Sequence, residues 1–437
     1  MKILICTLAL CGYLSGSALA LPLRQDPEKP KAVAAAMIDN LAKGDFIAAG
    51  SDFEETLEQQ IPPGKLKAVW LSVTAAAGAY QKRLEITAEP VSRGTMVSVI
   101  CVFEKKPMKV KLSFSAEQRI NGLWFLPAPS GLPGYADAGQ FTEEEFSFTA
   151  QGTTLNGTLT LPKGAGPFKA VLLVHGSGPN NRDEEIGPNK PFRDIAAGLA
   201  SRGIAVYRYD KRRGPPPGVA FADGTIKEEV LDDALAAAAA LRADRRIKPD
   251  GLYVLGHSLG GQLAPLIAQL DGKLAGIVVA AGPVRPFGAT LLRQITYLAE
   301  LDGTVTDAER ARIEALKKQA PLIDGPELNG NTPAKDLPPG LTPKYLLSLR
   351  SSEPVKTAAG LQVPILLLQG ERDYQVTMED FSLWREGLAG KPDAVFKSYP
   401  GLNHLFLGGE GPGNPAEYHT PGNVETAVIN DITSWLK

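Results

Sequence analysis

The chain has 437 residues, of which 44% are hydrophobic and 22% charged, and its formal net charge at pH 7 is -2. A chain of this length exceeds one ordinary hydrophobic core, so we expect two domains. The near-neutral charge excludes a basic nucleic-acid-binding or membrane-binding surface, because the densest cationic cluster is the short run 211–213.

The first twenty residues have the pattern of a secretory signal peptide. Lys2 gives a positive start, Ile3–Leu14 is almost entirely apolar, and Ala18-Leu19-Ala20 matches a small-x-small cleavage site. The apolar stretch is too short for a membrane-spanning helix, which needs ~20 residues. We therefore predict cleavage near Ala20 and a secreted or periplasmic protein with no stable membrane anchor. The alternative, a lipoprotein or uncleaved anchor, is disfavoured because a bulky leucine precedes Cys11.

Residues 21–126 are predicted to form a small α+β domain. Helical patterns come first and strand-like runs follow, an order that indicates helices packed on an antiparallel meander. Asn121-Gly122 is the strongest turn signal and predicts a hairpin. Cys101 lies in an apolar run and is expected to be a buried strand residue. The predicted helices are 29–43 and 65–80, and the predicted strands are 84–88, 95–103, 109–114 and 123–126.

Strand and helix patterns alternate after a Pro/Gly-rich linker at 127–140. Runs such as Val171–Val174 and Ile365–Leu368 show no polar alternation, which is typical of strands buried on both faces. Residues 141–437 are therefore predicted to form a doubly wound, mostly parallel α/β sheet led by an antiparallel hairpin. The predicted strands are 146–149, 155–161, 170–174, 204–209, 252–255, 275–280, 365–369 and 395–399; the predicted helices are 192–201, 226–242, 261–270, 377–388 and 424–435.

One long stretch, about 284–363, has no buried-strand pattern. It is predicted to form helices at 290–301 and 306–318, followed by a Gly/Pro-rich segment at 324–343. An insertion of this length inside a compact domain is usually functional. Because it leaves after one strand and returns before the next, we predict a cap over one edge of the sheet. Leu291, Ile295 and Leu298 form an apolar helical face that is expected to cover a pocket there, the alternative being packing on the body of the domain.

The segment Gly256-His257-Ser258-Leu259-Gly260 matches the pattern G-x-S-x-G. The match alone is weak, but a predicted strand ends just before it and a predicted helix begins just after it. Ser258 is thus placed on a sharp strand-to-helix turn, where small neighbours on both sides let the two elements approach. Ser258 is therefore the predicted nucleophile.

A serine nucleophile needs a base, and that base needs a carboxylate to orient it. In enzymes with this turn the partners follow in the order serine, acid, histidine, on loops after later strands. His404 follows the last predicted strand and is the predicted base, with His419 as the alternative. Asp373 follows the preceding strand and is the predicted acid. Glu371 and Asp380 are interpreted as ordinary solvated charges.

The tetrahedral intermediate of such a reaction also needs hydrogen-bond donors for its oxyanion. One predicted donor is the backbone N–H of Leu259, at the start of the helix after the nucleophile. The other is that of Ser177, in the glycine-rich loop His175-Gly176-Ser177-Gly178. The sequence shows neither an H-E-x-x-H motif nor paired cysteines, so we expect no metal and no cofactor.

Three motifs together resemble bacterial α/β-hydrolase esterases of the dienelactone-hydrolase-like branch. They are His175-Gly-Ser-Gly-Pro-Asn-Asn-Arg-Asp, Tyr209-Asp-Lys-Arg and Gly256-His-Ser-Leu-Gly-Gly. The similarity covers about 31–437, and the members that this chain resembles carry a signal peptide and an N-terminal domain of uncharacterised function. The resemblance implies the α/β-hydrolase fold. The chain departs from the family at 212–217, where two arginines, a glycine and three prolines replace a single arginine and glycine. This departure bears on the shape of the pocket.

Asp210, Lys211 and Arg212 follow a predicted strand at the same edge as the predicted triad. The favoured interpretation is a buried salt-bridge network that fixes this edge. The alternative is recognition of a substrate carboxylate by Lys211 or Arg212.

Taken with the resemblance, these residues predict a serine carboxylesterase that hydrolyses short-chain carboxylic esters through an acyl-enzyme intermediate, with a small-molecule ester as substrate. A serine peptidase or amidase with the same triad is the alternative. The N-terminal region is, however, too short for the β-propeller that prolyl-oligopeptidase relatives carry. A non-catalytic binding protein is disfavoured because the full set of triad and oxyanion residues is present.

Overall fold

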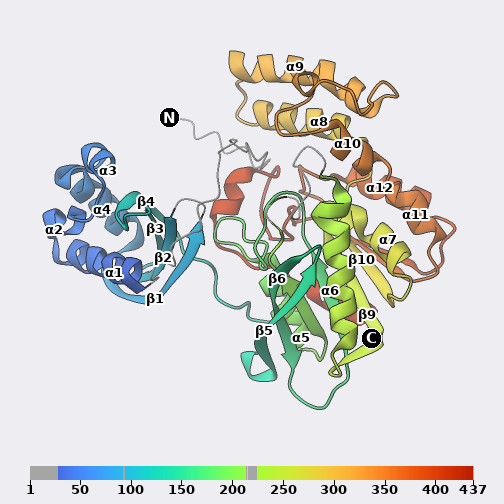
Figure 1. The fold of residues 1–437 in the computed structure, drawn as a ribbon, viewed down its shortest axis with the longest axis horizontal. Helices are drawn as coiled ribbons and strands as arrows, with labels where there is room; N and C mark the ends of the chain where they lie inside the picture. The colour runs from blue at the N-terminus through green and yellow to red at the C-terminus, as the bar shows by residue number, and fades with distance from the viewer. Residues whose placement is uncertain (1–27, 92–93, 213, 215–223, 437) are drawn as a thin grey trace. The chain divides into compact units, whose positions relative to one another are not determined.

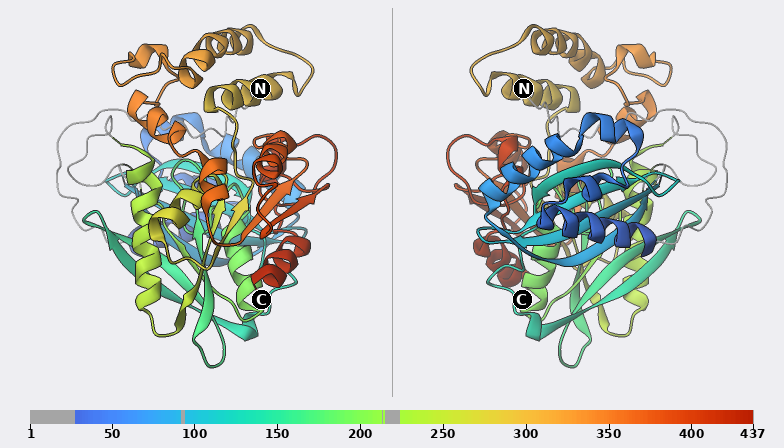
Figure 2. Two further views of the ribbon diagram at one scale, coloured as in Figure 1. Left: turned by 90° about the vertical axis from the view of Figure 1, so that its right-hand side faces the viewer. Right: turned by 90° about the vertical axis from the view of Figure 1, so that its left-hand side faces the viewer.

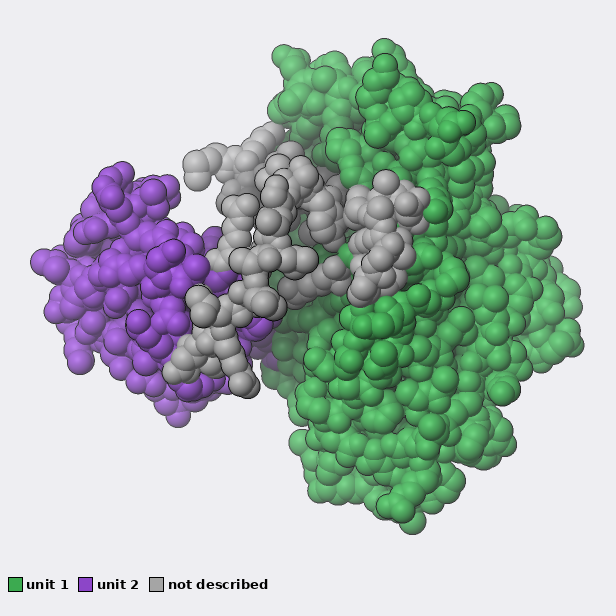
Figure 3. Space-filling view, in the orientation of Figure 1, with its two compact units in different colours: residues 1–14, 131–418, 422–437 green, residues 15–130, 419–421 purple. Residues whose placement is uncertain are grey.

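The structure is a computed structural model that describes residues 28–91, 94–212, 214 and 224–436. The predicted signal peptide lies outside these residues. The described chain divides into two compact units, one made of 28–130 with 419–421 and the other of 131–418 with 422–436 (Figure 3). Within the described ranges, no helix is both long and apolar enough to cross a bilayer.

The smaller unit packs helices against an antiparallel meander with the strand order β1-β2-β3-β4. Alternate residues of the second strand point into the core, where Val97, Val99 and Cys101 are fully buried. The prediction of a buried strand position for Cys101 is confirmed, and burial raises the pKa of its thiol to about 12. The elements are α1 (Glu28–Lys43), α2 (Phe46–Gly50), α3 (Glu55–Gln60), α4 (Pro63–Ala77), β1 (Tyr80–Val91), β2 (Gly94–Phe103), β3 (Met108–Phe114) and β4 (Ile120–Pro127).

The hairpin turn predicted at Asn121-Gly122 is wrong, because both residues lie inside β4. The chain instead reverses at 115–119, where Gln118 adopts a positive φ of 60°. Gly122 has a packing role: a β-carbon there would come within 2.3 Å of the Trp124 ring. The helices α2 and α3 were also not expected, since five and six residues are too few to show a helical period.

The larger unit is built on a mostly parallel sheet with the strand order β12-β11-β10-β9-β7-β8-β6-β5. The hairpin β5–β6 joins its edge in antiparallel fashion. This is the doubly wound sheet that the sequence predicts, and every predicted strand overlaps an observed one. The strands are β5 (Phe141–Ala150), β6 (Thr153–Pro162), β7 (Phe168–Val174), β8 (Ala205–Tyr209), β9 (Ile247–His257), β10 (Gly276–Ala280), β11 (Ile365–Gly370) and β12 (Ala394–Tyr399).

Successive strand residues point to opposite sides of the sheet. Because strands such as β7 and β11 are apolar on both sides, both faces of the sheet are covered by helices. On β7, Leu172 packs in a core with α6, α7 and α12, whereas its neighbour Leu173 packs in a second core with α5 and α13. Figure 1 shows α6 and α7 beside the strands of the sheet. These helices are α5 (Pro191–Ala200), α6 (Asp232–Ala243), α7 (Leu259–Asp271), α12 (Met378–Gly387) and α13 (Thr426–Leu436), and a π-helical turn, η3 (Lys227–Leu231), leads into α6.

A helical insertion separates β10 from β11 and forms the predicted cap. Its helices are α8 (Phe287–Glu300), α9 (Asp307–Asp324), α10 (Pro343–Arg350) and α11 (Pro354–Gly360). The first two confirm the helices predicted here, and they form a separate layer at the top of Figures 1 and 2. The short helices α10 and α11 were not predicted; each begins at a proline, which is favoured at the first helical position.

Candidate active site

Ser258 lies on the turn between β9 and α7, where its backbone has a φ of 53° and a ψ of -117°. A positive φ is strained for a residue with a β-carbon, so the surrounding structure must impose it. A β-carbon on Gly256 would come within 2.0 Å of the Gly260 carbonyl oxygen, and one on Gly260 within 2.2 Å of the Val174 carbonyl oxygen. The two glycines of the motif therefore allow a close approach of strand and helix that no larger residue permits.

Asp373 and His404 come together from the loops that follow the neighbouring strands β11 and β12. His404 Nδ1 lies 2.6 Å from Asp373 Oδ2, and both side chains are buried. The other carboxylate oxygen of Asp373 accepts the backbone N–H groups of Gln375 (2.8 Å) and Val376 (3.0 Å). These bonds fix the carboxylate so that it can hold the Nδ1–H of His404 and leave Nε2 for proton transfer.

The loop around His404 is held by its neighbour Asn403, whose Oδ1 accepts the N–H groups of Leu405 (3.0 Å) and Leu407 (3.2 Å). The alternative base, His419, is instead exposed at the end of the 3₁₀ turn η5 (Pro415–His419). Of the two predicted bases, the structure thus places His404 against Asp373.

The interpretation of Asp380 as a solvated charge is wrong, because its side chain is fully buried. Its Oδ1 accepts the N–H groups of Val284 (3.0 Å) and Arg285 (3.1 Å), and its Oδ2 binds the Arg285 guanidinium at 2.8 Å. It also forms a capping box with Thr377 at the start of α12, a Thr-x-x-Asp pattern visible in the sequence. Asp380 therefore fixes the point at which the cap leaves the sheet. Glu371, by contrast, is exposed as expected.

Ser258 lines a cavity of about 330 Å³. Ser177 and Leu259, the two predicted oxyanion donors, line the same cavity, and so do Gln375 and Val376, which bind Asp373. Much of the remaining wall comes from the cap helices. Among the described residues, no group of three or more His, Cys, Asp or Glu side chains is arranged to hold a metal ion.

Of the three apolar residues expected to cover this pocket, Leu291 lines the cavity. The expectation is wrong for the other two. Ile295 packs with α9 inside the cap, and Leu298 packs beside Tyr374 and Leu407. The three residues share one helical face, but α8 meets a different neighbour at each turn along its length.

A buried ion pair between Glu184 and His257 lies next to the predicted nucleophile, Ser258, and was missed by sequence reasoning. Its oxygen and nitrogen, Oε2 and Nδ1, are 2.9 Å apart. Glu184 Oε1 accepts the N–H of Gly176 at 2.6 Å, and His257 Nε2 lies 2.9 Å from the backbone oxygen of His404. Burial alone would lower the pKa of His257, but the charge and hydrogen bond of Glu184 outweigh it and raise that pKa. The pair therefore links the loop of the predicted oxyanion donor Ser177 to the loop of the predicted base.

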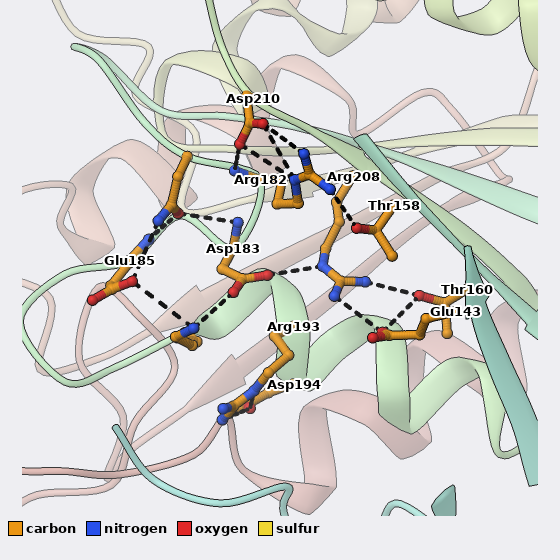
Figure 4. A network of polar contacts seen from close by, with 12 residues as sticks. Glu143, Thr158, Thr160, Arg182, Asp183, Glu185, Arg193, Asp194, Arg208 and Asp210 are labelled. Atoms are coloured by element: carbon orange, nitrogen blue, oxygen red, sulfur yellow. Dashed lines mark hydrogen bonds and ion pairs between the residues drawn. The ribbon is translucent and has the colours of Figure 1, made fainter. Parts of the chain in front are cut away.

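The side chains of Asp210, Lys211 and Arg212 each bind an opposite charge, and the prediction of buried salt bridges is confirmed for Lys211 and Arg212, whereas the Asp210 carboxylate is 42% exposed. Lys211 and Arg212 are only 5% and 6% exposed, so neither is free to receive a substrate carboxylate. Figure 4 shows the Arg182 guanidinium bound to the Asp210 carboxylate. The neighbouring Arg208 binds Asp183, the residue after Arg182, at 2.9 Å. The three ion pairs are Asp210–Arg182 (2.8 Å), Lys211–Glu229 (2.6 Å) and Arg212–Asp233 (2.5 Å).

Comparison with known proteins identifies relatives of both units. The model of the alpha/beta hydrolase family matches residues 171–417, and that of a family of unknown function, DUF3887, matches residues 34–123. Esterase EstD of Thermotoga maritima is 34% identical over 413 residues, which cover 91% of this chain and 93% of that protein. The uncharacterized peptidase YtmA of Bacillus subtilis is 23% identical, over 66% of this chain and 91% of that protein. Among solved structures, Est1E from Butyrivibrio proteoclasticus is similar with a TM-score of 0.43 at 17% identity, over 67% of this chain and 97% of that one.

Proposed function

Because the chain belongs to the alpha/beta hydrolase family, we propose that it is a serine carboxylesterase that cleaves short-chain carboxylic esters through an acyl-enzyme intermediate. The observation that carries this proposal is the strained turn of Ser258, which lines a cavity beside a buried Asp373–His404 pair. The similarity to a protein named as an esterase, over nearly the whole chain, supports the ester as substrate.

The proposed reaction begins when Ser258 Oγ attacks the ester carbonyl carbon and His404 Nε2 takes the hydroxyl proton. Asp373 stabilises the resulting imidazolium by accepting the Nδ1–H of His404. The carbonyl oxygen becomes an oxyanion that accepts the N–H groups of Leu259 and Ser177. His404 then protonates the leaving alcohol as the carbon–oxygen bond breaks. Water, activated by the same histidine, releases the acid and restores the serine.

The size of the cavity favours a small substrate. A volume of about 330 Å³ is at the low end of the range of ligand pockets, which is ~300–1,000 Å³. Its wall mixes apolar groups, such as Phe287 and Leu291, with the amides of Gln262 and Gln294. We expect activity to be highest on acetyl to hexanoyl esters, with no increase at an oil–water interface.

A peptidase or amidase with the same triad is the second candidate, because a relative named as a peptidase matches 66% of the chain. The proposed site of action is outside the cytoplasm. The sequence pattern of the first twenty residues supports secretion after cleavage near Ala20.

The test is the rate of hydrolysis of p-nitrophenyl esters of graded chain length beside aminoacyl anilides, for the wild type and Ser258→Ala. Ser258→Ala should lower turnover by at least ~10⁴-fold and abolish labelling by a fluorophosphonate probe. Labelling retained in the alanine variant would exclude Ser258 as the nucleophile. Faster cleavage of anilides than of esters would favour the peptidase.

A further inference from the structure

The peptide bond between Gly176 and Ser177 is held by a buried charge. Lys211 Nζ donates to the Gly176 carbonyl oxygen at 2.7 Å, and the Lys211 side chain is almost fully buried. The amide of Asn180 donates to the same oxygen at 3.3 Å. Gly176 itself lies against the nucleophile, because a β-carbon on it would come within 3.1 Å of the Ser258 β-carbon.

This contact fixes the direction of the neighbouring N–H group. A trans peptide is planar, and its C=O and N–H bonds point in opposite directions. The ammonium group on the Gly176 oxygen therefore turns the Ser177 N–H to the other side. A positive charge on that oxygen also polarises the peptide, which makes the N–H a stronger donor.

Glu229, on the π-helical turn η3, holds Lys211 in this position. Its carboxylate lies 2.6 Å from Lys211 Nζ. Burial would raise the pKa of Glu229, but the charge and hydrogen bond of Lys211 outweigh it and keep that pKa below its ordinary value. The Lys211–Glu229 pair thus holds the loop at the oxygen of Gly176, the residue before Ser177.

The cap comes close to the same carboxylate. Tyr345, on α10, lines the cavity that contains Ser258, and burial together with the nearby Glu229 carboxylate raises the pKa of its hydroxyl well above the ordinary value. A hydrogen bond ties α10 to the start of η3, because the N–H of Ile226 donates to Ser348 Oγ at 3.2 Å. The cap helix α10 is therefore bonded directly to the turn that carries Glu229.

We propose that Lys211 and Glu229 are positioning residues that orient and polarise the Ser177 N–H as an oxyanion donor, and that the Tyr345 hydroxyl binds Glu229 and thereby couples this donor to the cap. The proposal rests on the proposed serine hydrolase function. It gives Lys211 a role in the transition state that is neither purely structural nor contact with a substrate carboxylate.

The principal test is the double variant Lys211→Met with Glu229→Gln, which removes both charges without leaving either one buried alone. Loss of a whole oxyanion donor lowers kcat about 10²–10³-fold, so loss of its orientation should lower kcat by about 10- to 100-fold. KM for p-nitrophenyl butyrate should change little, because the oxyanion exists only in the transition state. The affinity of a trifluoromethyl ketone, which forms an oxyanion on Ser258, should fall with kcat.

The matched control is Arg212→Met with Asp233→Asn. Arg212 follows Lys211 in the sequence and is as buried as Lys211, and Asp233 is fully buried, but the further hydrogen bond of this pair goes to Ala150 and not to the oxyanion loop. The control should keep a kcat close to that of the wild type. An equal loss of kcat in both double variants, or a wild-type kcat and ketone affinity in the Lys211→Met, Glu229→Gln variant, would overturn the proposal.

Tyr345→Phe tests the link to the cap and keeps the proposal open to refutation if the double variant does not fold. It should lower kcat about fivefold, the equivalent of one hydrogen bond, and by one common factor for acetyl, butyryl and hexanoyl esters. A changed chain-length preference with kcat intact would mean that Tyr345 only shapes the pocket, and would overturn the coupling. Activity retained in Ser258→Ala would instead refute the proposed function itself.

Discussion

Glu184→Gln is the sharpest perturbation of the buried Glu184–His257 ion pair beside Ser258. Glutamine has nearly the same shape and can still accept the N–H of Gly176, so the change removes charge and little else. His257, which is 5% exposed, then loses its counter-ion while it stays buried. Breaking a buried pair by removing one partner costs about 3–5 kcal/mol. Because the bond to Gly176 survives, we expect the free energy of unfolding to fall by ~3 kcal/mol, the low end of that range.

The pH dependence of this loss follows from both pKa shifts. The pKa of His257 is raised above its ordinary 6.5, so its contribution is fully present below pH 6.5 and is lost as pH rises through the raised value. The pKa of Glu184 is lowered below its ordinary 4.5, so its contribution is present above pH 4.5 and is lost as pH falls through the lowered value. The difference in the free energy of unfolding between wild type and variant should therefore be largest between pH 4.5 and pH 6.5.

The assay is urea unfolding followed by tryptophan fluorescence, at about pH 5.5 and at a pH above the raised pKa of His257. The imidazole pKa, measured by NMR, should fall in Glu184→Gln, since burial then acts without the carboxylate. The control is Glu145→Gln, whose ion pair with Arg182 has a 72% exposed carboxylate and should be worth about 0–1 kcal/mol. Equal stability of wild type and Glu184→Gln at the lower pH, with an unchanged pKa of His257, would refute the reasoning.

His404→Ala should be as inactive as Ser258→Ala, and the double variant no worse, because triad members act as a unit; a fully active His404→Ala would move the base elsewhere. Leu291→Trp should shift the chain-length preference for p-nitrophenyl esters, whereas Ile295→Trp, inside the cap, should mainly lower the melting temperature. An unchanged preference in Leu291→Trp would contradict a cap over the cavity. Mass spectrometry of protein from the periplasm or medium should show a chain that begins at Leu21; a membrane-bound species that retains 1–20 would contradict cleavage.

The sequence was most informative where one local pattern decides the structure. Buried strands such as β7 and β11 are visible as unbroken apolar runs, and Ser258 is placed by glycines that the turn requires. Local patterns failed where the same residues serve another purpose, as at Gly122, which makes room for a tryptophan ring inside a strand. They also failed for Glu184, because its pairing with His257 depends on contacts between distant segments and on a positive φ of 50° at Glu184 itself.

The buried carboxylates at this edge of the sheet share one physical cause. A loop that leaves a strand loses the ladder partners of its backbone N–H groups, and a buried N–H without a partner is costly. Glu184 accepts the N–H of Gly176 in the oxyanion loop, Asp373 accepts N–H groups of its own loop, and Asp380 accepts that of Val284 where the cap begins. Each carboxylate also binds an arginine or a histidine, which makes its burial tolerable. The acids therefore act on loops that surround Ser258 and leave the hydrogen bonds of the sheet intact.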